Sequence, residues 1–583
     1  MKKSIVVFIC CLLSGLGFAK SVYITDMSKC KPAAFSEKLE QGKWQLIDYS
    51  TAELRGKMIG TLAHINAPAV TVPVQVNGWH KIYVGYWNPK FDSNWGTPTT
   101  LQIKLSDQKG FRLIHDSASN GTQDATFLRE VYFDCADLTG KDIVLDKSNG
   151  LLGHRVYYAY IKLVPMSDKE IESVIADRED DSTRNLTSTI DGMSYFFWNQ
   201  FEDEEDILSL VEPYRYSDVG KVLWAVNYGD RVNYPTKVAG AIFVDKWASY
   251  DFEDGVIPTK RNRGETQMKN TLLNFASKGI IAQNIAAKHC HEMGIKFDIM
   301  MRLGILGKIP ASQSHGGFLD QNPDCRQMLA DGTVLEKASF AFPKTQDFML
   351  GLIRESASQI DCDGVNLCFV RGPHALWYEK PILRRFKEKY GEDARKVDPS
   401  DKRLHSIRAE IMTEFMQKVR KCLDEVGCAK GKKIELSIWV WPSWRKVWLG
   451  STPYEEGLDV KAWIEAGLLD EVICQQGIDK DYIAAGKAND CEFTLFPDYR
   501  GVDVMGPASI VKFHDQGIEK FAYWDMDCAQ IRANAWEWIK MSGHYDFLKS
   551  WDSSQHNAGS FRLMTVDGID VEKGLATAVY SGG

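Results

Sequence analysis

Hydrophobic and polar positions alternate along the first part of the chain, between residues 22 and 165. The clearest alternating runs are Val74 and Val76, then Ile82, Val84 and Tyr86, then Leu101, Ile103 and Leu105, and then Val156, Tyr158 and Tyr160. Asn-Gly and Asn-Pro pairs separate several of the runs and are typical of turns. Because every second side chain of a strand faces the same way, the pattern predicts antiparallel strands with one buried face. We interpret residues 20–165 as a β-sandwich domain.

From residue 192 onward, short apolar runs alternate with segments that have the period of a helix. The runs lie at residues 193–198, 222–227, 297–303, 365–370, 434–441, 471–475, 493–496 and 521–524. The helix predicted between Arg403 and Asp424 has an apolar stripe at three- and four-residue steps. Strands separated by helices imply a parallel sheet, and eight such strands can close into a barrel. We therefore expect an α/β fold, with a (β/α)8 TIM barrel over residues 191–550 preceded by the antiparallel β-sandwich.

Two further segments flank the predicted barrel. Residues 166–190 are rich in Asp, Glu and Arg, and we interpret them as a linker. Residues 551–583 contain C-terminal strand patterns that pack back on either the barrel or the sandwich. An open doubly wound sheet is the alternative to the barrel, but it should carry a glycine-rich phosphate-binding turn after its first strand. The sequence Trp198-Asn199-Gln200-Phe201 offers no such turn, so the pattern favours the barrel.

The first residues have the features of a secretory signal peptide. Lys2 and Lys3 precede an apolar run, and small residues that end at Ala19 follow it. The apolar run is too short to cross a bilayer, and no later segment is long and apolar enough to do so. We therefore expect residues 1–19 to be a signal peptide cleaved near Ala19, and the mature protein to be secreted or periplasmic without a membrane span.

Charge and cysteine usage exclude several classes of partner and cofactor. The formal net charge of −8 argues against nucleic acid, whose binding needs clustered Lys and Arg. The 13 cysteines show no Cys-x-x-Cys pair and no zinc-like spacing. The segment His289-Cys290-His291-Glu292 is predicted to end a surface helix, where positions two residues apart point to different sides. We expect neither a metal ion nor another cofactor.

Polar and aromatic residues gather where the predicted strands end, which is where barrel enzymes keep their ligand sites. The strand at 365–370 continues into a loop that contains Arg371, His374, Trp377 and Glu379. The other strand ends contribute Arg302, Trp439, Trp441, Gln475, Asp498, Trp524, Asp525 and Asp527. Indole rings cover the apolar faces of sugars, while carboxylates and amides bind sugar hydroxyls. We predict that these residues bind a sugar, apart from three carboxylates that we assign to catalysis.

The three predicted catalytic residues are Asp498, Glu379 and Asp525. Hydrolysis of a glycosidic bond needs one carboxyl group to protonate the leaving oxygen and a second to attack or to activate water. Strands four and seven lie almost opposite in an eight-stranded barrel, so we expect Glu379 and Asp498 to face each other. A separation of about 5–5.5 Å predicts retention, and roughly 6.5–9.5 Å predicts inversion. The alternative for each carboxylate alone is a helix cap or an ion pair.

A set of motifs gives the chain a family resemblance. Residues 363–371 read Asp-Gly-Val-Asn-Leu-Cys-Phe-Val-Arg, and the pairs Asn322-Pro323, Asp331-Gly332, Phe342-Pro343 and Tyr390-Gly391 flank them together with Phe386. Over the predicted barrel, this set resembles the bacterial family 10 glycosylhydrolase-like proteins. The resemblance implies a secreted β/α barrel that acts on polysaccharide. Such barrels commonly have a second acidic residue in this strand, and here Cys368 stands in its place.

Two functions follow from these observations. The first is a secreted glycoside hydrolase that cleaves a polysaccharide or oligosaccharide through paired carboxylates at the C-terminal rim of the barrel. The second is a non-catalytic carbohydrate-binding or cell-surface protein on the same scaffold, which Cys368 favours because a thiol cannot replace a glycosidic acid. In the sandwich domain, Trp79, Trp87 and Trp95 are candidates for stacking on sugars, with a place in the domain core or at its rim as the alternative.

Overall fold

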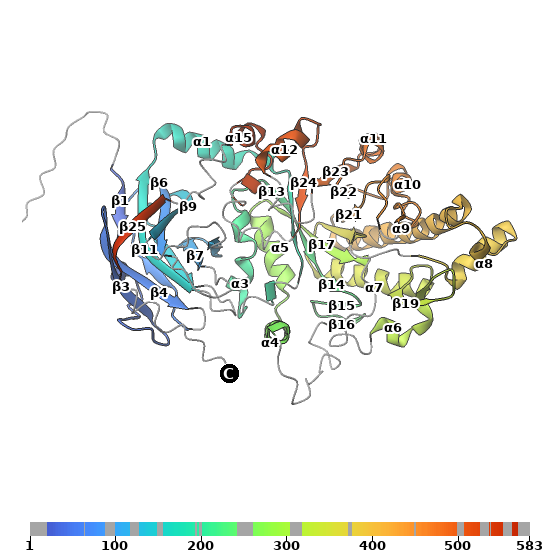
Figure 1. Cartoon of the computed structure of the whole chain (residues 1–583), viewed down its shortest axis with the longest axis horizontal. Helices are drawn as coiled ribbons and strands as arrows, with labels where there is room; N and C mark the ends of the chain where they lie inside the picture. Colours follow the sequence, from blue (N-terminus) through green and yellow to red (C-terminus); the bar gives the residue numbers. More distant parts are fainter. Residues whose placement is uncertain are drawn as a thin grey trace, which may run out of the picture.

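The chain has a sheet-rich region at its start and a closed barrel after it (Figure 1). The structure is a computed structural model, and it describes residues 20–62, 65–87, 99–116, 127–147, 155–192, 195–196, 201–241, 260–303, 317–370, 376–447, 450–497, 506–524, 536, 538–551 and 562–569. Among these residues, no helix combines the length and the apolar character needed to cross a membrane. The expected combination of a mixed α/β barrel and a separate sheet region is confirmed.

The first region is a large sheet of mostly antiparallel strands. Its strands are β1 (Val22–Ile24), β2 (Phe35–Ser36), β3 (Trp44–Thr51), β4 (Arg55–Leu62), β5 (Val70–Val72), β6 (Trp79–Trp87), β7 (Thr99–Leu105), β8 (Arg112–Asp116), β9 (Phe127–Asp137), β10 (Ile143–Lys147), β11 (Arg155–Pro165) and β25 (Arg562–Ile569). Two separate apolar clusters form from these strands. An irregularity in β11 at Tyr158 and Tyr160 shifts the alternation, so that Tyr158 joins one cluster and Tyr160 the other.

The strand β25 closes this region. It follows the barrel in sequence, yet it pairs antiparallel with β3 and with β9. Because β3 pairs with β4, β4 with β11, β11 with β6 and β6 with β9, the pairings return to the strand where they began. Figure 1 shows β25 in red among the blue strands of the N-terminal region. β25 therefore belongs to the sheet region, a choice that the sequence pattern left open.

The barrel consists of parallel strands paired in a closed order. They are β12 (Leu186–Ile190), β13 (Val219–Ala225), β17 (Lys296–Arg302), β20 (Gly364–Cys368), β21 (Glu435–Val440), β22 (Glu471–Gln475), β23 (Glu492–Phe496) and β24 (Phe521–Tyr523). Small sheets lie in its loops: β14 (Asn227–Tyr228), β15 (Arg231–Val232) and β16 (Gly240–Ala241), and separately β18 (Arg326–Met328) and β19 (Val334–Ala338). The number of barrel strands and the positions predicted for seven of them agree with the structure.

The predicted position of the first barrel strand is wrong. We expected it at residues 193–198, but β12 spans Leu186–Ile190, and the two described residues Tyr195 and Phe196 are helical. The sequence of β12 is Leu-Thr-Ser-Thr-Ile, in which apolar residues stand at the two ends alone. Thr187 and Thr189 face the barrel interior, so the strand lacks the continuous apolar run that usually marks a central parallel strand. The segment interpreted as a linker therefore contains a barrel strand.

Helices surround the barrel and connect its strands. Their bounds are α1 (Asp168–Glu179), α3 (Glu204–Leu208), α4 (Lys260–Lys278), α5 (Ala282–Glu292), α6 (Phe318–Gln321), α7 (Pro343–Gln359), α8 (Lys380–Tyr390), α9 (Lys402–Lys430), α10 (Val460–Glu465), α11 (Lys480–Ala488), α12 (Pro507–His514) and α15 (Tyr545–Lys549). The stripe predicted in α9 is buried, from Leu404 to Leu423. Asp401 caps the start of α9 and Gly431, with a φ of 70°, ends it.

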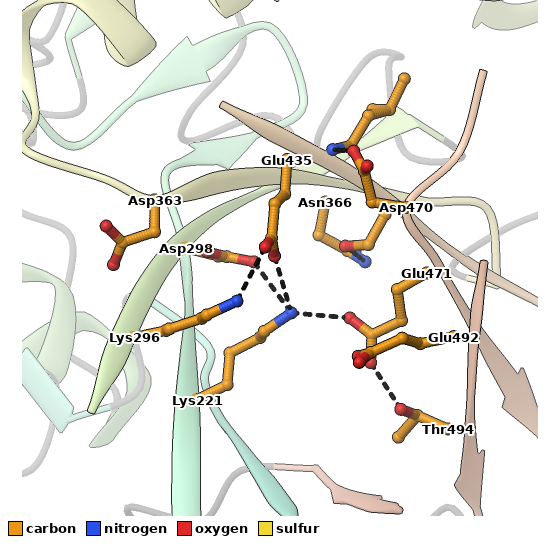
Figure 2. A network of polar contacts seen from close by, with 12 residues as sticks. Lys221, Lys296, Asp298, Asp363, Asn366, Glu435, Asp470, Glu471, Glu492 and Thr494 are labelled. Carbon is orange, nitrogen blue, oxygen red and sulfur yellow. Dashed lines mark hydrogen bonds and ion pairs between the residues drawn. The ribbon is translucent and has the colours of Figure 1, made fainter. Parts of the chain in front are cut away.

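The N-terminal end of the barrel contains a buried ion network (Figure 2). Lys221 of β13 places its Nζ 2.9 Å from Glu471 Oε2, 3.5 Å from Glu435 Oε2 and 3.6 Å from Asp298 Oδ2. Thr494 donates its hydroxyl to Glu471. Asp298 is 0% exposed, and a Cβ atom on Gly364 would lie 2.7 Å from its Oδ2. The Asp-Gly motif at 363–364 thus has a structural reason, because its glycine leaves room for Asp298.

The network sets the protonation of its own members. Burial alone would lower the pKa of Lys221, but the carboxylates of Glu471, Asp298 and Glu435 outweigh it and raise the pKa well above its ordinary value. Burial raises the pKa of Asp298 to about 7, although Lys221 opposes the shift. The attraction of Lys221 and the hydrogen bond from Thr494 outweigh burial at Glu471, so its pKa is lowered. The charge of Lys221 is therefore what keeps Glu471 ionised inside the barrel.

The sheet region and the barrel meet through charged side chains of α1. Arg178 donates to Asp134 Oδ1 at 3.1 Å and to the carbonyl of Cys135 at 2.8 Å. His544 places Nε2 2.8 Å from Asp177 of α1 and Nδ1 2.9 Å from Asp218, the residue before β13. Hydrogen bonds with Asp177 and then Asp218 raise the pKa of His544 from 6.5 to about 10. A protonated His544 therefore joins α1 to the first strands of the barrel.

We expect Lys221→Met to lower the free energy of unfolding by about 3–5 kcal/mol, because Glu471 and Asp298 would remain buried without a cation. Urea unfolding followed by circular dichroism measures this quantity. Lys296→Met is the matched control, since Lys296 also pairs with Glu435 but its side chain is 54% exposed, and it should cost less than about 1 kcal/mol. Equal losses in the two variants would contradict the structural role of Lys221.

We expect the stability that His544 contributes to depend on pH. Its folded-state pKa lies above its ordinary value, so the contribution is full below about pH 6.5 and is lost as the pH rises toward 10. Between these limits, the unfolding free energy of the wild type should fall more steeply than that of His544→Gln. Parallel slopes for the two proteins in urea titrations at several pH values would show that His544 is not the linked group.

Candidate functional site

Side chains from four strands meet inside the C-terminal end of the barrel, and we call this place the mouth. The Arg302 guanidinium carbon lies 5.2 Å from the ring centre of Trp524. The rings of Trp439 and Trp524 are 5.0 Å apart, and those of Trp439 and Phe496 are 4.9 Å apart, both edge to face. These residues come from β17, β21, β23 and the end of β24. Arg302, Trp439 and Trp524, which the sequence predicted to share one site, are thus brought together.

Several buried polar atoms at the mouth have no hydrogen-bond partner within the described part of the chain. They are Arg302 Nε and Nη2, Trp439 Nε1, Trp441 Nε1 and Gln475 Oε1. Arg302 is 4% exposed and Gln475 2% exposed. An unsatisfied buried polar group costs about 1–3 kcal/mol, so folded proteins rarely keep such groups without water or a ligand to satisfy them. The mouth therefore offers donors, an acceptor and aromatic faces to a bound polar molecule.

Asn227 fixes the position of Arg302 and was not predicted from the sequence. Its Oδ1 accepts the backbone N–H of Arg302 at 2.7 Å, and its Nδ2 donates to the carbonyls of Gly229 at 3.1 Å and Arg302 at 3.3 Å. Asn227 is buried, so these bonds form away from water. It thereby holds the end of β17 in register with the loop after β13. The available signal was an amide residue at the end of a predicted strand.

The register of β12 points to Asp191 as a further residue on the side of the mouth, and sequence reasoning missed it. Thr187 pairs in register with the inward-facing Lys221, and Thr189 with the inward-facing Leu223. Side chains of a strand alternate, so Asp191, the residue that follows β12, continues the inward-facing series at the C-terminal end. It is 9% exposed. We missed Asp191 because we placed the first strand several residues too late.

The contacts of Glu379 speak against the catalytic role predicted for it. Its carboxylate accepts the N–H of Trp377 at 2.9 and 3.1 Å and the N–H of Met328 at 3.3 Å. The residue is 1% exposed, and this burial raises its pKa to about 7. Trp377 packs against the core between strands and helices, not in the cluster inside the barrel. Glu379 therefore holds the segment before α8 against β18, and Trp377 lies on the outer side of the barrel.

Five predicted site residues lie outside the described residues. These are Asp498 and Asp525, predicted to be catalytic, and Arg371, His374 and Asp527, predicted to bind the substrate. Their roles stay predictions. Of the predicted binding residues that the structure describes, Trp441 lies just after β21, with the guanidinium carbon of Arg445 4.7 Å from its ring centre.

Cys368 lies within the apolar cluster inside the barrel. It pairs in register with Arg302 on one side and with Trp439 on the other. The position at which family 10 glycosylhydrolase-like proteins commonly have an acid therefore lies between two residues of the mouth. A buried thiol there packs as a small apolar group.

The two histidines of the segment 289–292, in which the sequence predicted no metal site, have different carboxylate partners. His289 Nε2 lies 2.5 Å from Glu212, whereas His291 Nε2 lies 2.8 Å from Asp363. Across the described residues, no group of three or more His, Cys, Asp and Glu side chains is arranged to hold a metal ion.

In the core of the sheet region, Trp87 is fully buried, so it does not offer the sugar-stacking face that the sequence suggested.

No family model matches the chain, and no curated protein sequence matches it. Among solved structures, it is similar to α-L-fucosidase isoenzyme 2 from Paenibacillus thiaminolyticus, at 9% identity over 62% of this chain and 49% of that chain, with a TM-score of 0.36. It is also similar to the PgaB (BpsB) glycoside hydrolase domain from Bordetella bronchiseptica, at 10% identity over 61% of this chain and 97% of that domain, with a TM-score of 0.39.

A third similar structure is the GH20 exo-β-N-acetylglucosaminidase from Vibrio harveyi, at 8% identity over 70% of this chain and 58% of that chain, with a TM-score of 0.32. The chain thus spans about half of the fucosidase and 58% of the glucosaminidase. Although the similar structures are glycoside hydrolases, likeness at this level says nothing about the activity or substrate of this chain. The resemblance to family 10 proteins has no family-model or sequence match behind it.

We expect Asn227→Ala to lower the free energy of unfolding by about 1–3 kcal/mol, because the buried N–H of Arg302 would lose its acceptor. The measurement is urea unfolding, with Asn489→Ala as the control. Asn489 donates to a backbone carbonyl from an exposed position, so its loss should change the free energy by less than about 0.5 kcal/mol. A smaller loss for Asn227→Ala than for the control would remove Asn227 as the residue that positions Arg302.

Proposed function

We propose that the chain is a glycoside hydrolase that cleaves a polysaccharide at the mouth of its barrel. The observation that carries the proposal is the meeting of Arg302, Trp439 and Trp524. Within the described residues, Arg302 Nε and Nη2 and Trp439 Nε1 have no hydrogen-bond partner. Indole rings cover the apolar face of a pyranose, and a guanidinium donates to its hydroxyls or to a carboxylate it carries. A sugar would therefore satisfy both the polar and the apolar surface of the mouth.

The chemistry of glycoside hydrolysis requires two carboxyl groups on opposite sides of the bond. Asp191 is the candidate that the inward-facing series of β12 supports, and Asp498 and Asp525 are the candidates from the ends of β23 and β24. One of them would protonate the leaving oxygen, and a second would attack the anomeric carbon or activate water. Arg302 and Gln475 would orient the sugar, and Asn227 would hold Arg302 in position. We keep Glu379 out of this mechanism because its oxygens accept backbone hydrogen bonds.

A second candidate function is sugar binding without cleavage, and Cys368 favours it. The thiol stands between Arg302 and Trp439, where an acid would reach a sugar in the mouth. A thiol cannot serve as the acid of a glycosidase, so a barrel that relied on this position would bind and not cut.

We also propose that the chain is secreted or periplasmic, because its first residues have the features of a signal peptide.

The decisive measurement is the release of reducing ends from a panel of neutral and acidic polysaccharides by the chain that begins at Lys20. We expect Asp498→Asn or Asp525→Asn to abolish release while circular dichroism shows a folded protein, because either change removes a carboxyl group from the reaction. Asp191→Asn tests the further candidate in the same way. Full activity in one variant removes that residue from the mechanism. Binding of a polymer without any release by the wild type would favour the second function.

We expect Arg302→Met to lower kcat/KM roughly 10–100-fold, as the loss of one or two hydrogen bonds to a charged group predicts. Arg354→Met is the matched control, because Arg354 forms an exposed ion pair with Glu425 on the outside of the barrel. The control should leave kcat/KM unchanged. Equal effects of the two substitutions would place Arg302 outside the binding site.

A further inference from the structure

Trp444 is 61% exposed, more than any other large apolar residue in the part of the chain that the structure describes. It stands in the loop after β21, on the side of the barrel where the mouth lies. The same segment supplies Trp439, which is fully buried in the mouth, and Trp441, which is partly buried. Indoles along this short segment thus go from buried through partly buried to exposed.

The loop that carries Trp444 is fixed by specific contacts. Asp479 accepts the backbone N–H of Ser443 at 2.5 Å. The side chain of Arg445 donates to the carbonyl of Gln476 at 2.9 Å, and its guanidinium covers Trp441. These bonds tie the loop after β21 to the loop after β22. Trp444 is therefore exposed on a loop with a defined conformation.

The backbone after β22 makes room for the indole. A Cβ atom added to Gly477 would lie 3.0 Å from Trp444 Cζ2 and 2.8 Å from Pro442 Cγ, so a larger residue there would displace one of them. The preceding residue, Gln476, has a φ of 56°, which is uncommon for a residue other than glycine. Backbone strain of this kind is concentrated at functional sites. The chain therefore keeps a strained turn and a glycine beneath an indole that solvent can reach.

Resting on the function proposed above, we propose that Trp444 is an outer sugar-binding subsite, on which a pyranose of a polysaccharide stacks while another part of the same chain occupies the mouth. One exposed indole covers one face of a sugar ring, which is what such stacking requires. Ser443 and the exposed Lys446, which are close to Trp444 in sequence, are polar. A stable protein interface would need several hundred Å² on each side with an apolar centre, so a sugar fits this surface better than a second protein.

The inference implies that the substrate bound at the mouth is a polysaccharide. A polymer that extends beyond the mouth can bind a subsite outside the barrel, and a short oligosaccharide would not reach it. We therefore expect Trp444 to contribute to long substrates and not to short ones, which is a dependence on chain length that a residue needed for folding would not produce.

The test measures retardation in gels that contain each polysaccharide, together with kcat/KM for polymers and for short oligosaccharides from the same polymer. We expect Trp444→Ala to weaken polymer affinity and to lower kcat/KM on polymers about tenfold, with short oligosaccharides unaffected. Trp444→Phe should retain most of the affinity. Gly477→Ala should weaken it by displacing Pro442 or the indole of Trp444 from their present positions. Phe547→Ala, which removes an exposed aromatic ring from α15, is the matched control and should behave as the wild type.

The outcomes separate this inference from the proposed function. Equal retardation of wild type and Trp444→Ala on every polymer that the wild type binds would overturn the subsite and leave the hydrolase proposal standing. The wild type could bind a polymer and release no reducing ends, while Trp444→Ala loses the retardation. That combination would support the subsite and overturn the hydrolase proposal. A change in oligomeric state with unchanged polymer affinity, measured by sedimentation, would make Trp444 a protein contact and overturn the subsite.

Discussion

The burial of Lys221 among three carboxylates is the constraint on which the barrel depends. Five of its strands contribute to this network, from β13 to β23, and each must hold its register for the charges to meet. A slip of one residue would turn a charged side chain outward into the apolar layer beneath the helices and leave its partners uncompensated. The charge pairing at the N-terminal end thus fixes the register of these five strands. Closed barrels usually keep residues for stability at this end and residues for chemistry at the other.

The same register carries over to the mouth. In β17, Asp298 faces the network, Met300 fills the middle and Arg302 reaches the mouth, each two residues from the last. The site therefore inherits its geometry from the network. Asn227 adds the last adjustment by holding the backbone of Arg302 from a neighbouring strand. The result is a set of donors and rings that are placed before any ligand arrives, which reduces the ordering cost of binding.

Sequence patterns predicted the helices and strands with strong periodicity. They failed for a strand without an apolar run and for a contact between residues distant in sequence. The stripe of α9 and seven barrel strands were predictable because apolar residues dominate each of them in a local run or stripe. β12 was not predictable, because the polar residues Thr187 and Thr189 interrupt its apolar pattern. Asp191, which follows β12, was therefore not predicted as a site residue. For Glu379 the sequence favoured a catalytic role, because the residue lies in a polar loop after β20. Its contact with the N–H group of Met328 depends on a hairpin 51 residues away in sequence. No local pattern reports such a contact.

The pairing of β25 with β3 and β9 has a consequence for biogenesis. A ribosome releases the strands of the first sheet long before it makes their last neighbour, so the growing chain must carry two unpaired strand edges while the whole barrel is synthesised. Exposed edges of this kind are templates for pairing with other chains. The barrel can close as soon as its own eighth strand emerges, and the sheet cannot. The N-terminal sheet therefore closes after β25 has been synthesised. A nascent chain that ends before β25 leaves β3 and β9 without this partner strand.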